Sequence, residues 1–463
     1  MPFLTFGGGL NEQDDINIIA DECVEGQNFK LDRQGRSFMP REPFDLKGTA
    51  PNGAENRGIM QLVKNNKTRT TLQQSGDTVY SVSSSFTYTA LPLTVNAGSR
   101  LRGTRWALND VMVIGDLDLL TTVKRWDGST FDTLPHVTPG VTDLYSKYVK
   151  DFQNRLWHFN IKTDSTDLPH VILVSEFENY LGYDRQTTAR GGDPGTTIAN
   201  GDQAFWLVSP DLKPINGVAI FYETLVISTE GGRLFKLEGT DATDFRFVEY
   251  YSGSSALGPE GMVNIGNDIM YVREGPAVEL LSSTDRYGDV ASDDASRWIP
   301  TSVANLSDPL AVYDQKQQDV YFFTDGFILV FDKDIYLNGE FSPWSKWTTQ
   351  MAAGLTPKAA ISLLDPSTGR QTVYFGGPNG ELYDIHGTST NGDIDTNPIR
   401  TSRKSRLIVE LDSIRNAFAG RVTYRRKGEF FMNMALEWSA NYANTTASIK
   451  LKGPIVGAGT IFY

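Results

Sequence analysis

The sequence has one cysteine, a start without a basic or apolar leader, and no long apolar run. With Cys23 alone, no disulfide can form within the chain, so we expect folding in a reducing cytosol. No segment reaches the roughly 18 consecutive apolar residues of a membrane-spanning helix, and Met1 to Gly9 lacks the pattern of a signal peptide. Secretion by the usual route and membrane anchoring are therefore not expected.

Positive charge is also scarce, because 43 Lys and Arg residues face 56 Asp and Glu residues, for a net charge of −13. Binding of nucleic acid through its phosphates needs a cationic surface, so the charge argues against it. One stretch departs from this balance and has only Glu410 and Asp412 as acids. Its cations are Arg400, Arg403, Lys404, Arg406, Arg415, Arg421, Arg425, Arg426 and Lys427.

This basic cluster has two interpretations, a subunit interface or a solvated strand face, and we favour the interface. An acidic segment near the start of the chain is the candidate partner, within one subunit or between two. Its acids are Glu12, Asp14, Asp15, Asp21 and Glu22. We therefore place Arg403, Lys404, Arg406, Arg421, Arg425, Arg426 and Lys427, with Asp14 and Asp15, among the candidate interface residues.

Motifs for catalysis and for cofactor binding are missing. The nearest match to a serine nucleophile elbow, Gly253-Ser254-Ser255-Ala256-Leu257, lacks the closing glycine, and there is no phosphate-binding loop and no His-Glu-x-x-His pair. The four histidines lack metal-ligand spacing, and the pair Asp293-Asp294 is interpreted as solvated charge. The sequence therefore predicts no enzyme activity, no catalytic residues, no cofactor and no metal.

What the sequence has in abundance is short strands of β-branched and aromatic residues between Gly, Asn or Asp turns. Seven such strands recur, and several continue through a turn into another strand, as in residues 231–237 and 377–384. Spacings of roughly 32 to 69 positions are close to or above those of propeller blades. The strands are 79–82, 111–114, 156–159, 225–228, 269–272, 320–323 and 373–376.

We therefore predict a mainly β protein whose main domain, residues 33–387, is a β-propeller of about six to seven blades. Residues 1–32 are expected to form an N-terminal arm. Residues 388–463, with expected strands at 407–411, 421–425 and 434–438, are expected to form a small β-sheet or sandwich. An insertion at about 180–210, which includes Arg190 and Asp193, is predicted to project as a loop that gates a channel or contacts another subunit.

The N-terminal segment resembles that of the tail nozzle, or tail hub, proteins of short-tailed bacteriophages, the family of tail tubular protein B. The resemblance rests on Phe6-Gly7-Gly8-Gly9-Leu10-Asn11, on Gly26-Gln27-Asn28-Phe29 and on Arg33-Gln34-Gly35-Arg36, with the acidic stretch between them. The blades from about Thr71 to Tyr383 also look like the propeller of that family.

The resemblance implies a virion structural protein, assembled in the host cytoplasm, that forms a homohexameric ring below a dodecameric adaptor in the tail. Such a ring retains and ejects double-stranded DNA through a central channel without binding it specifically, which suits an acidic surface. It also implies docking surfaces for fibres or spikes, although this chain is short for the family. The competing hypothesis is a carbohydrate-binding or glycan-cleaving propeller on a virion or cell surface, in which Trp157, Trp206 and Trp344 stack on sugars. A third hypothesis is a cellular scaffold propeller, which predicts a monomer with an exposed groove for a partner.

Overall fold

The structure, a computed structural model, describes most of the chain between residues 23 and 387 and several short strands beyond it. Two compact units, Met1–Arg406 and Leu407–Tyr463, divide the chain. In strands after residue 402, and in a few before it, only the backbone is described. The described ranges are 12, 23–31, 38–136, 138, 140–183, 202–221, 224–266, 268–283, 290–338, 342–348, 357–387, 402–405, 421–424, 433–440, 443–450 and 459–462.

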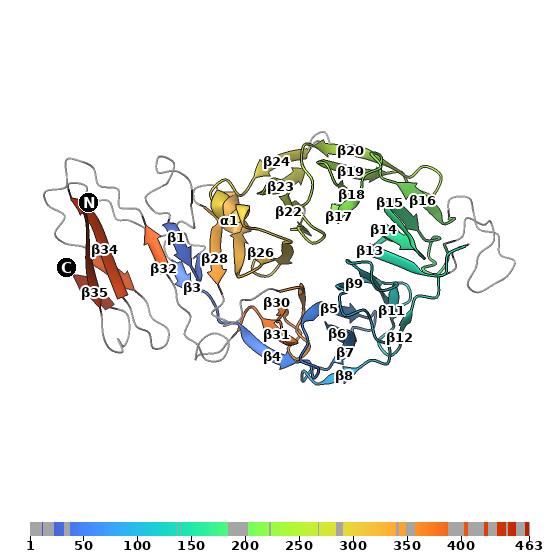
Figure 1. The fold of residues 1–463 in the computed structure, drawn as a ribbon, viewed down its shortest axis with the longest axis horizontal. Coiled ribbons are helices and arrows are strands. Elements are labelled where there is room, and N and C mark those ends of the chain that lie inside the picture. Colours follow the sequence, from blue (N-terminus) through green and yellow to red (C-terminus); the bar gives the residue numbers. More distant parts are fainter. Residues whose placement is uncertain are drawn as a thin grey trace. The chain divides into compact units, whose positions relative to one another are not determined.

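Seven four-stranded antiparallel sheets are arranged in a ring as the blades of a β-propeller, which confirms the predicted fold class (Figure 1). Blades one to three consist of β5 (Asn56–Val63), β6 (Arg69–Ser75), β7 (Thr78–Val82) and β8 (Tyr88–Ala90); β9 (Leu101–Trp106), β10 (Val111–Asp116), β11 (Lys124–Trp126) and β12 (Phe131–Thr133); and β13 (Leu144–Phe152), β14 (Arg155–Thr163), β15 (Thr166–Val174) and β16 (Phe205–Val208).

Blades four to seven follow in chain order, and the last blade borrows a strand from the N-terminal region. They consist of β17 (Ile215–Phe221), β18 (Thr224–Thr229), β19 (Arg233–Glu238) and β20 (Arg246–Ser252); β21 (Met262–Asn264), β22 (Ile269–Arg273), β23 (Ala277–Ser283) and β24 (Val290–Asp294); β25 (Leu310–Asp314), β26 (Asp319–Thr324), β27 (Phe327–Asp332) and β28 (Trp344–Thr348); and β29 (Ala360–Leu364), β30 (Gln371–Gly376), β31 (Glu381–Asp384) and β4 (Asp45–Thr49).

Six of the seven recurring segments are the second strands of their blades, and their residues are almost entirely buried. A second strand has hydrogen-bonded neighbours on both sides and other blades against both faces. Its sequence is therefore a nearly continuous run of apolar residues. Trp157 and Phe159 of β14, for example, share a core cluster with Leu225 and Ile227 of β18. The interfaces between blades thus form the hydrophobic core.

The first blade departs from this rule because its second strand, β6, is polar. Gln73, Gln74 and Ser75 are fully buried there, and the recurring segment at 79–82 is instead the third strand, β7. The Gln74 amide donates to the carbonyl oxygen of Ser99 at 2.8 Å, and its side-chain oxygen accepts the backbone N–H of Leu101. Buried polar groups are tolerated when hydrogen-bonded, so these contacts join blades one and two beside the apolar cluster that also spans them, which includes Leu72 and Ile114.

The ring closes through β4, which comes from the start of the propeller and pairs antiparallel with β31 from its end. Asp384 lies opposite Asp45 in this register, and Glu381 lies opposite Thr49. The carbonyl oxygen of Gly380 accepts hydrogen bonds from the backbone N–H of Ala50 at 2.9 Å and from the Gln73 amide at 2.7 Å. Two chain segments more than 300 residues apart therefore complete one blade.

The described part of the N-terminal arm, residues 12 and 23–31, is attached to the rest of the first unit. β1 (Cys23–Gln27) pairs with β32 (Ser402–Ser405), and β2 (Phe29–Leu31) pairs with β3 (Phe38–Pro40). Between β1 and β2, the backbone N–H of Asn28 donates to the carbonyl oxygen of Lys346 in β28 at 2.8 Å. Phe29 is completely buried in the core cluster of blades five and six, and its carbonyl oxygen accepts the Trp347 indole N–H at 2.8 Å.

The predicted insertion at 180–210 is wrong at both ends. Tyr180 and Tyr183 are buried in a core cluster with Trp106, and residues 205–208 form β16, the outer strand of the third blade. The run Phe205-Trp206-Leu207-Val208 is apolar enough to extend a sheet, which outweighs the turn-rich composition around it. Residues 184–201, with Arg190 and Asp193, lie outside the described residues.

Two short helices and two short sheets complete the described structure. The helices are α1 (Pro300–Ala304) and α2 (Lys333–Asn338), both before or within the sixth blade. In the second unit, β33 (Arg421–Tyr424) pairs with β36 (Gly459–Phe462), and β34 (Asn433–Ala440) pairs with β35 (Ala443–Lys450). The expected strands at 421–425 and 434–438 thus coincide with β33 and β34, while 407–411 lies outside the described residues.

Candidate functional site

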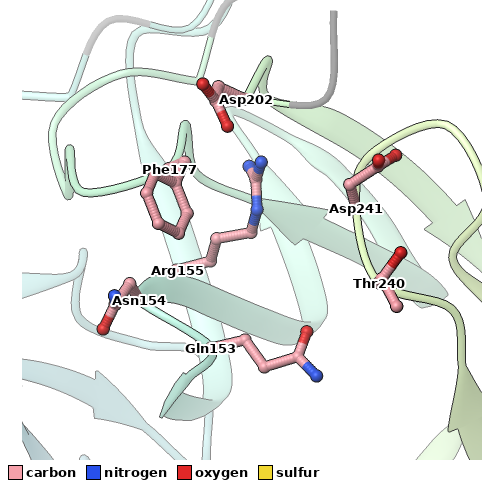
Figure 2. A pocket seen from close by; sticks show the side chains of 7 residues that line it. All are labelled: Gln153, Asn154, Arg155, Phe177, Asp202, Thr240 and Asp241. Atoms are coloured by element: carbon pink, nitrogen blue, oxygen red, sulfur yellow. The ribbon is translucent and has the colours of Figure 1, made fainter. Parts of the chain in front are cut away.

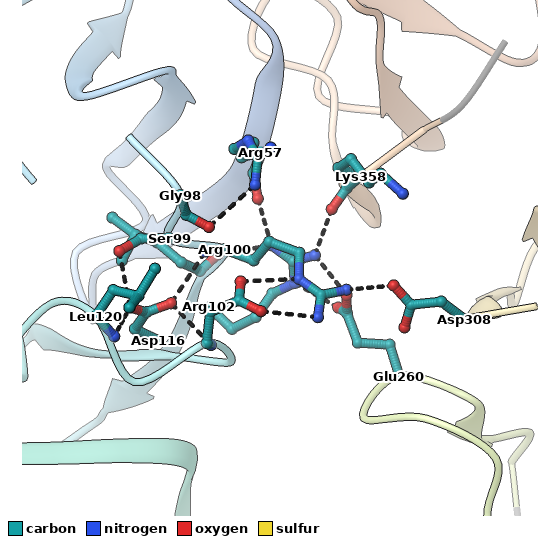
Figure 3. A network of polar contacts seen from close by, with 12 residues as sticks. Arg57, Gly98, Ser99, Arg100, Arg102, Asp116, Leu120, Glu260, Asp308 and Lys358 are labelled. Carbon is teal, nitrogen blue, oxygen red and sulfur yellow. Dashed lines mark hydrogen bonds and ion pairs between the residues drawn. The ribbon is translucent and has the colours of Figure 1, made fainter. Parts of the chain in front are cut away.

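Groups from five blades meet where the inner strands begin (Figure 3). They are the charged side chains of Arg100, Arg102, Glu260 and Asp308 and the backbone carbonyls of Arg57 and Lys358. Each blade starts with its inner strand, so the residues just before or within the starts of these strands come close together. We call this group the axial clamp. It consists of Arg57 and Arg102, in β5 and β9, and of Arg100, Glu260, Asp308 and Lys358, which shortly precede β9, β21, β25 and β29.

Arg102 is the centre of the axial clamp. Its guanidinium binds Glu260 through two hydrogen bonds, from Nε to Oε1 and from Nη2 to Oε2. The same group donates to the carbonyl oxygens of Arg57 and Lys358, at 2.8 Å each. One side chain therefore connects blades one, two, five and seven, in the bidentate geometry for which a guanidinium is suited.

Arg100 makes a second bridge across the axis. It binds both carboxylate oxygens of Asp118 at 3.0 and 3.1 Å, and it reaches Asp308 of the sixth blade at 2.7 Å. Burial by itself would lower the pKa of Arg100, but its hydrogen bonds and ion pairs with Asp118 and Asp308 raise that pKa above its ordinary value. The bridge therefore stays charged across the whole physiological pH range.

Asp116 holds the loop that presents Arg100. Its buried carboxylate accepts the Ser99 hydroxyl at 2.7 Å and the backbone N–H groups of Arg100, Leu120 and Thr121 at 2.8 to 3.0 Å. A carboxylate that accepts several backbone N–H groups fixes the local chain direction. The axial clamp thus links the inner ends of several blades through hydrogen bonds and paired charges.

A depression of about 340 Å³ lies at the rim between blades three and four (Figure 2). Arg155 forms its floor, and Phe177, Asp202 and Asp241 surround the guanidinium. The Arg155 Nη1 donates to the carbonyl oxygens of Ser175 and Gln203, at 2.7 and 2.9 Å.

Burial lowers the pKa of Arg155 to about 10, against the opposing effect of Asp202, Asp241 and Glu176. The side chain remains a cation at neutral pH, and its backbone contacts hold the 175–177 and 202–205 segments together. Phe177 is 39% exposed at the edge of the depression. Arg155 therefore anchors the segments on either side of residues 184–201.

Two histidines occupy opposite electrostatic environments. His158 is completely buried, its Nε2 lies 2.8 Å from the Tyr183 hydroxyl, and burial lowers its pKa to about 3. His386 lies between two carboxylates, 2.7 Å from Glu42 and 2.7 Å from Asp314. Burial would lower the pKa of His386, but these two contacts raise it to about 9. His386 thus ties the chain before β4 to the sixth and seventh blades.

The structure places few of the predicted interface residues. Arg403 and Lys404 belong to β32, where they lie opposite Gly26 and Glu25 of β1, and the backbone of Arg421 belongs to β33. The arm and the start of the basic stretch are therefore neighbours along the backbone, while the side-chain pairing stays a prediction. Arg406, Arg425, Arg426, Lys427, Asp14, Asp15, Arg190 and Asp193 lie outside the described residues.

Glu12, an expected partner of the basic cluster, contacts the start of α1 instead. Its carboxylate accepts the Ser302 backbone N–H at 2.7 Å and the Ser302 hydroxyl at 2.5 Å. Two of the three tryptophans of the carbohydrate hypothesis also differ from expectation. Trp157 and Trp344 are completely buried in blade cores and cannot stack on a sugar, while Trp206 is exposed.

The axial clamp was missed in the sequence because its residues are isolated charges that are scattered from position 57 to position 358. A usable signal was present: charges recur just before or at the start of the inner strand in several repeats, such as Arg102, Glu260 and Asp308. Which of these charges pair depends on the ring closing, since 158 positions separate Arg102 from Glu260.

The comparisons with known proteins give a fold likeness only. No known family model matches the sequence, and no curated protein does. The β-propeller domain of Cps50 (Swd1) from Myceliophteria thermophila is similar, with a TM-score of 0.45 and 10% identity over 74% of this chain and 99% of that one. The WD40 β-propeller domain of Doa1 follows with 0.41 and 8%, over 74% and 96%. Likenesses at these scores carry no argument about function.

In the part of the chain that the structure describes, no group of three or more His, Cys, Asp or Glu side chains is placed to hold a metal ion. No helix in that part is long and apolar enough to cross a membrane.

Proposed function

We propose that this protein is a structural subunit of the tail nozzle of a short-tailed bacteriophage. In this proposal it forms a ring, as a homohexamer, below the adaptor of the virion tail. Double-stranded DNA is retained by the ring and passes through it at ejection. The subunit has no catalytic role, and fibres or spikes are further partners.

The proposal rests on how one of the motifs that resemble the tail nozzle family, residues 26–29, is attached to the propeller. Asn28 of the Gly26-Gln27-Asn28-Phe29 motif has a positive φ of 59°, in the left-handed region that Asn adopts more readily than most residues. Its side-chain oxygen accepts the Thr348 backbone N–H at 2.8 Å and the Arg41 Nε–H at 3.0 Å. The motif thus has a structural task in fastening the arm, which fits an architectural protein.

The axial clamp supports a specific form of the proposal. Arg102 and Glu260 join across the propeller axis, so DNA does not pass along the axis of one subunit. In the proposed ring, the DNA channel lies between subunits, and each propeller is a rigid block in the wall. The net charge of −13 favours passage of DNA without long residence on that wall.

The test is the mass of the purified protein in solution together with negative-stain imaging, alone and after mixing with virion tail fractions. A ring with a central hole, or a monomer that becomes a ring only on tails, is the expected result. A monomer that ignores tail fractions would overturn the proposal, most clearly if it bound glycans instead.

A further inference from the structure

The outer strand of the third blade, β16, exposes an apolar edge. It pairs with β15 on one side, and no described residue pairs with its other side. Trp206 is 43% exposed and Val208 is 49% exposed, on alternate positions of a strand with no charged residue. Leu212, shortly after the strand, is 64% exposed. An edge of this kind offers both free backbone groups and an apolar surface to another strand.

Other described outer strands are protected in ways that β16 is not. Charged residues occur in β4, β12, β20 and β24, and β8 is only three residues long without a large exposed apolar side chain. The arm lies along β28 and bonds to it through Asn28 and Lys346. Short length, charge and coverage are the usual means by which edge strands avoid pairing. Among the described outer strands, β16 therefore combines exposed apolar side chains with an edge that no described strand covers.

The partner that fits is extended, apolar at alternate positions and basic at its ends. Asp202 precedes β16 and Asp211 follows it, so acidic residues flank the apolar edge on both sides. The segment Leu407-Ile408-Val409-Glu410-Leu411 has the required composition, with four apolar residues that include the strong β formers Ile408 and Val409. Cations flank it on both sides, with Arg403, Lys404 and Arg406 before it and Arg415 after it.

We propose that the edge of β16 binds residues 407–411 of a second copy of this chain as an added β-strand. The segment cannot reach the third blade of its own propeller. It follows β32 after the single residue Arg406, and β32 pairs with β1, which lies beside β28 across the ring from β16 (Figure 1). Leu407 is two residues beyond Ser405, where β32 ends, and two residues span at most about 7 Å, so the strand is supplied in trans.

This contact is head-to-tail, because one subunit contributes a blade edge and the next contributes a segment from elsewhere in the chain. Repetition of such a heterologous contact produces a closed ring when the rotation closes. The inference therefore rests on the ring of the proposed function and names the surface through which neighbouring subunits join.

The first experiment is the solution mass of full-length variants by light scattering, over a range of concentrations. Trp206→Lys and Val208→Lys each place a charge on the edge and are expected to shift the protein to monomers. Thr89→Lys, on the exposed outer strand β8, is the matched control and is expected to keep the wild-type mass. A ring that persists in both β16 variants overturns the docking inference while leaving the nozzle proposal standing.

The second experiment measures binding of a fluorescent synthetic peptide of residues 404–413 to the full-length protein. It tests the inference even if the wild-type protein is a monomer when it is alone in solution. Binding is expected, with at least tenfold weaker affinity for Trp206→Lys and for a peptide carrying Arg406→Glu. Equal affinity of wild type and Trp206→Lys, or no binding to wild type, would refute the inference. Circular dichroism of each variant establishes that the propeller is folded.

Discussion

Proteins usually bury apolar side chains and expose charged ones. The end of the propeller axis and the rim of the third blade both depart from this rule, the first with partly buried charges and the second with exposed apolar side chains. At the axis, the charged groups Arg102 and Glu260 are only 20% and 17% exposed, but each has its partner within the chain. At the rim, Trp206 and Val208 are apolar and exposed. Partners at the axis come from blades that the ring brings together, whereas the rim strand has only one described neighbour.

The difference shows that position in the ring, and not residue type, decides which groups are available for binding. The charged groups at the axis form contacts with one another within the chain, and these contacts hold the blades together. At the rim, no described strand pairs with the outer edge of β16. Four predictions test this contrast, beginning with the largest expected effect.

Removal of one partner at the axis should be the most damaging change. Glu260→Ala leaves Arg102 without its carboxylate in a mostly buried place, and we expect a loss of about 2 to 4 kcal/mol in the free energy of unfolding. Urea denaturation measures it. The double variant Arg102→Met with Glu260→Met should recover part of the loss, and Glu230→Ala, at an exposed turn, should change stability by less than about 0.5 kcal/mol. Equal losses for Glu260→Ala and Glu230→Ala would mean that the axial clamp is not a brace.

The contacts of His386 with Glu42 and Asp314, which we call the His386 seam, should make the stability of the protein depend on pH. His386 has its pKa raised to about 9 by Glu42 and Asp314, against about 6.5 when unfolded. Its stabilisation, roughly 2 to 3 kcal/mol, is therefore complete below about pH 6.5 and is lost as the pH rises through 9.

Unfolding free energies at pH 6.5 and 9.5 measure this effect, with His386→Gln as the comparison. The variant should show a much smaller decrease between the two values than the wild type. Glu42 and Asp314 have lowered pKa values, so their own contribution is lost only at acid pH. A wild type and a variant with the same pH dependence would contradict the assignment of the seam.

Loss of the polar contact that Gln74 makes between blades one and two should lower the free energy of unfolding by an intermediate amount. Gln74→Leu leaves the Leu101 N–H and the Ser99 carbonyl without their buried partner, and we expect a loss of about 2 kcal/mol. The measurement is chemical denaturation, and Thr89→Val on the exposed rim is the control. A neutral or stabilising effect of Gln74→Leu would show that apolar packing suits this interface equally well.

At the rim, the smallest effect on folding is expected. Trp206→Thr should change the unfolding free energy by less than about 1 kcal/mol, because the side chain is 43% exposed and Thr also favours strands. The measurement is made at a concentration where the protein is monomeric. A loss above 2 kcal/mol would place Trp206 in the core of the blade and remove it from the docking surface.

Much of the fold could be predicted from the sequence because most second strands are apolar on both faces. Val111-Met112-Val113-Ile114 and Val320-Tyr321-Phe322-Phe323 are examples, and each identified one blade. The second strand β6 was missed because Gln73, Gln74 and Ser75 replace its apolar residues. Hydrophobic patterns carry no information about hydrogen bonds to Gly380 or Ser99, which lie elsewhere in the chain.

The candidate site was much less predictable than the fold. The basic cluster was visible as composition, but its placement is described only for Arg403, Lys404 and Arg421, and for the backbone alone. The axial clamp and the His386 seam gave no cluster in the sequence, since their members are far apart along the chain. Glu12 was grouped with the acidic segment by proximity in sequence, yet it contacts Ser302.

By itself, the sequence determined that this chain forms a repeated β structure, because alternation, turn residues and buried strands are local properties. Only the tertiary structure decided that there are seven blades, that β4 closes the ring, and that Arg102 meets Glu260 across its axis. These outcomes depend on contacts between segments separated by 150 to more than 300 residues. Such contacts form because a closed ring of twisted sheets brings every inner strand to one axis and leaves each outer strand at the rim.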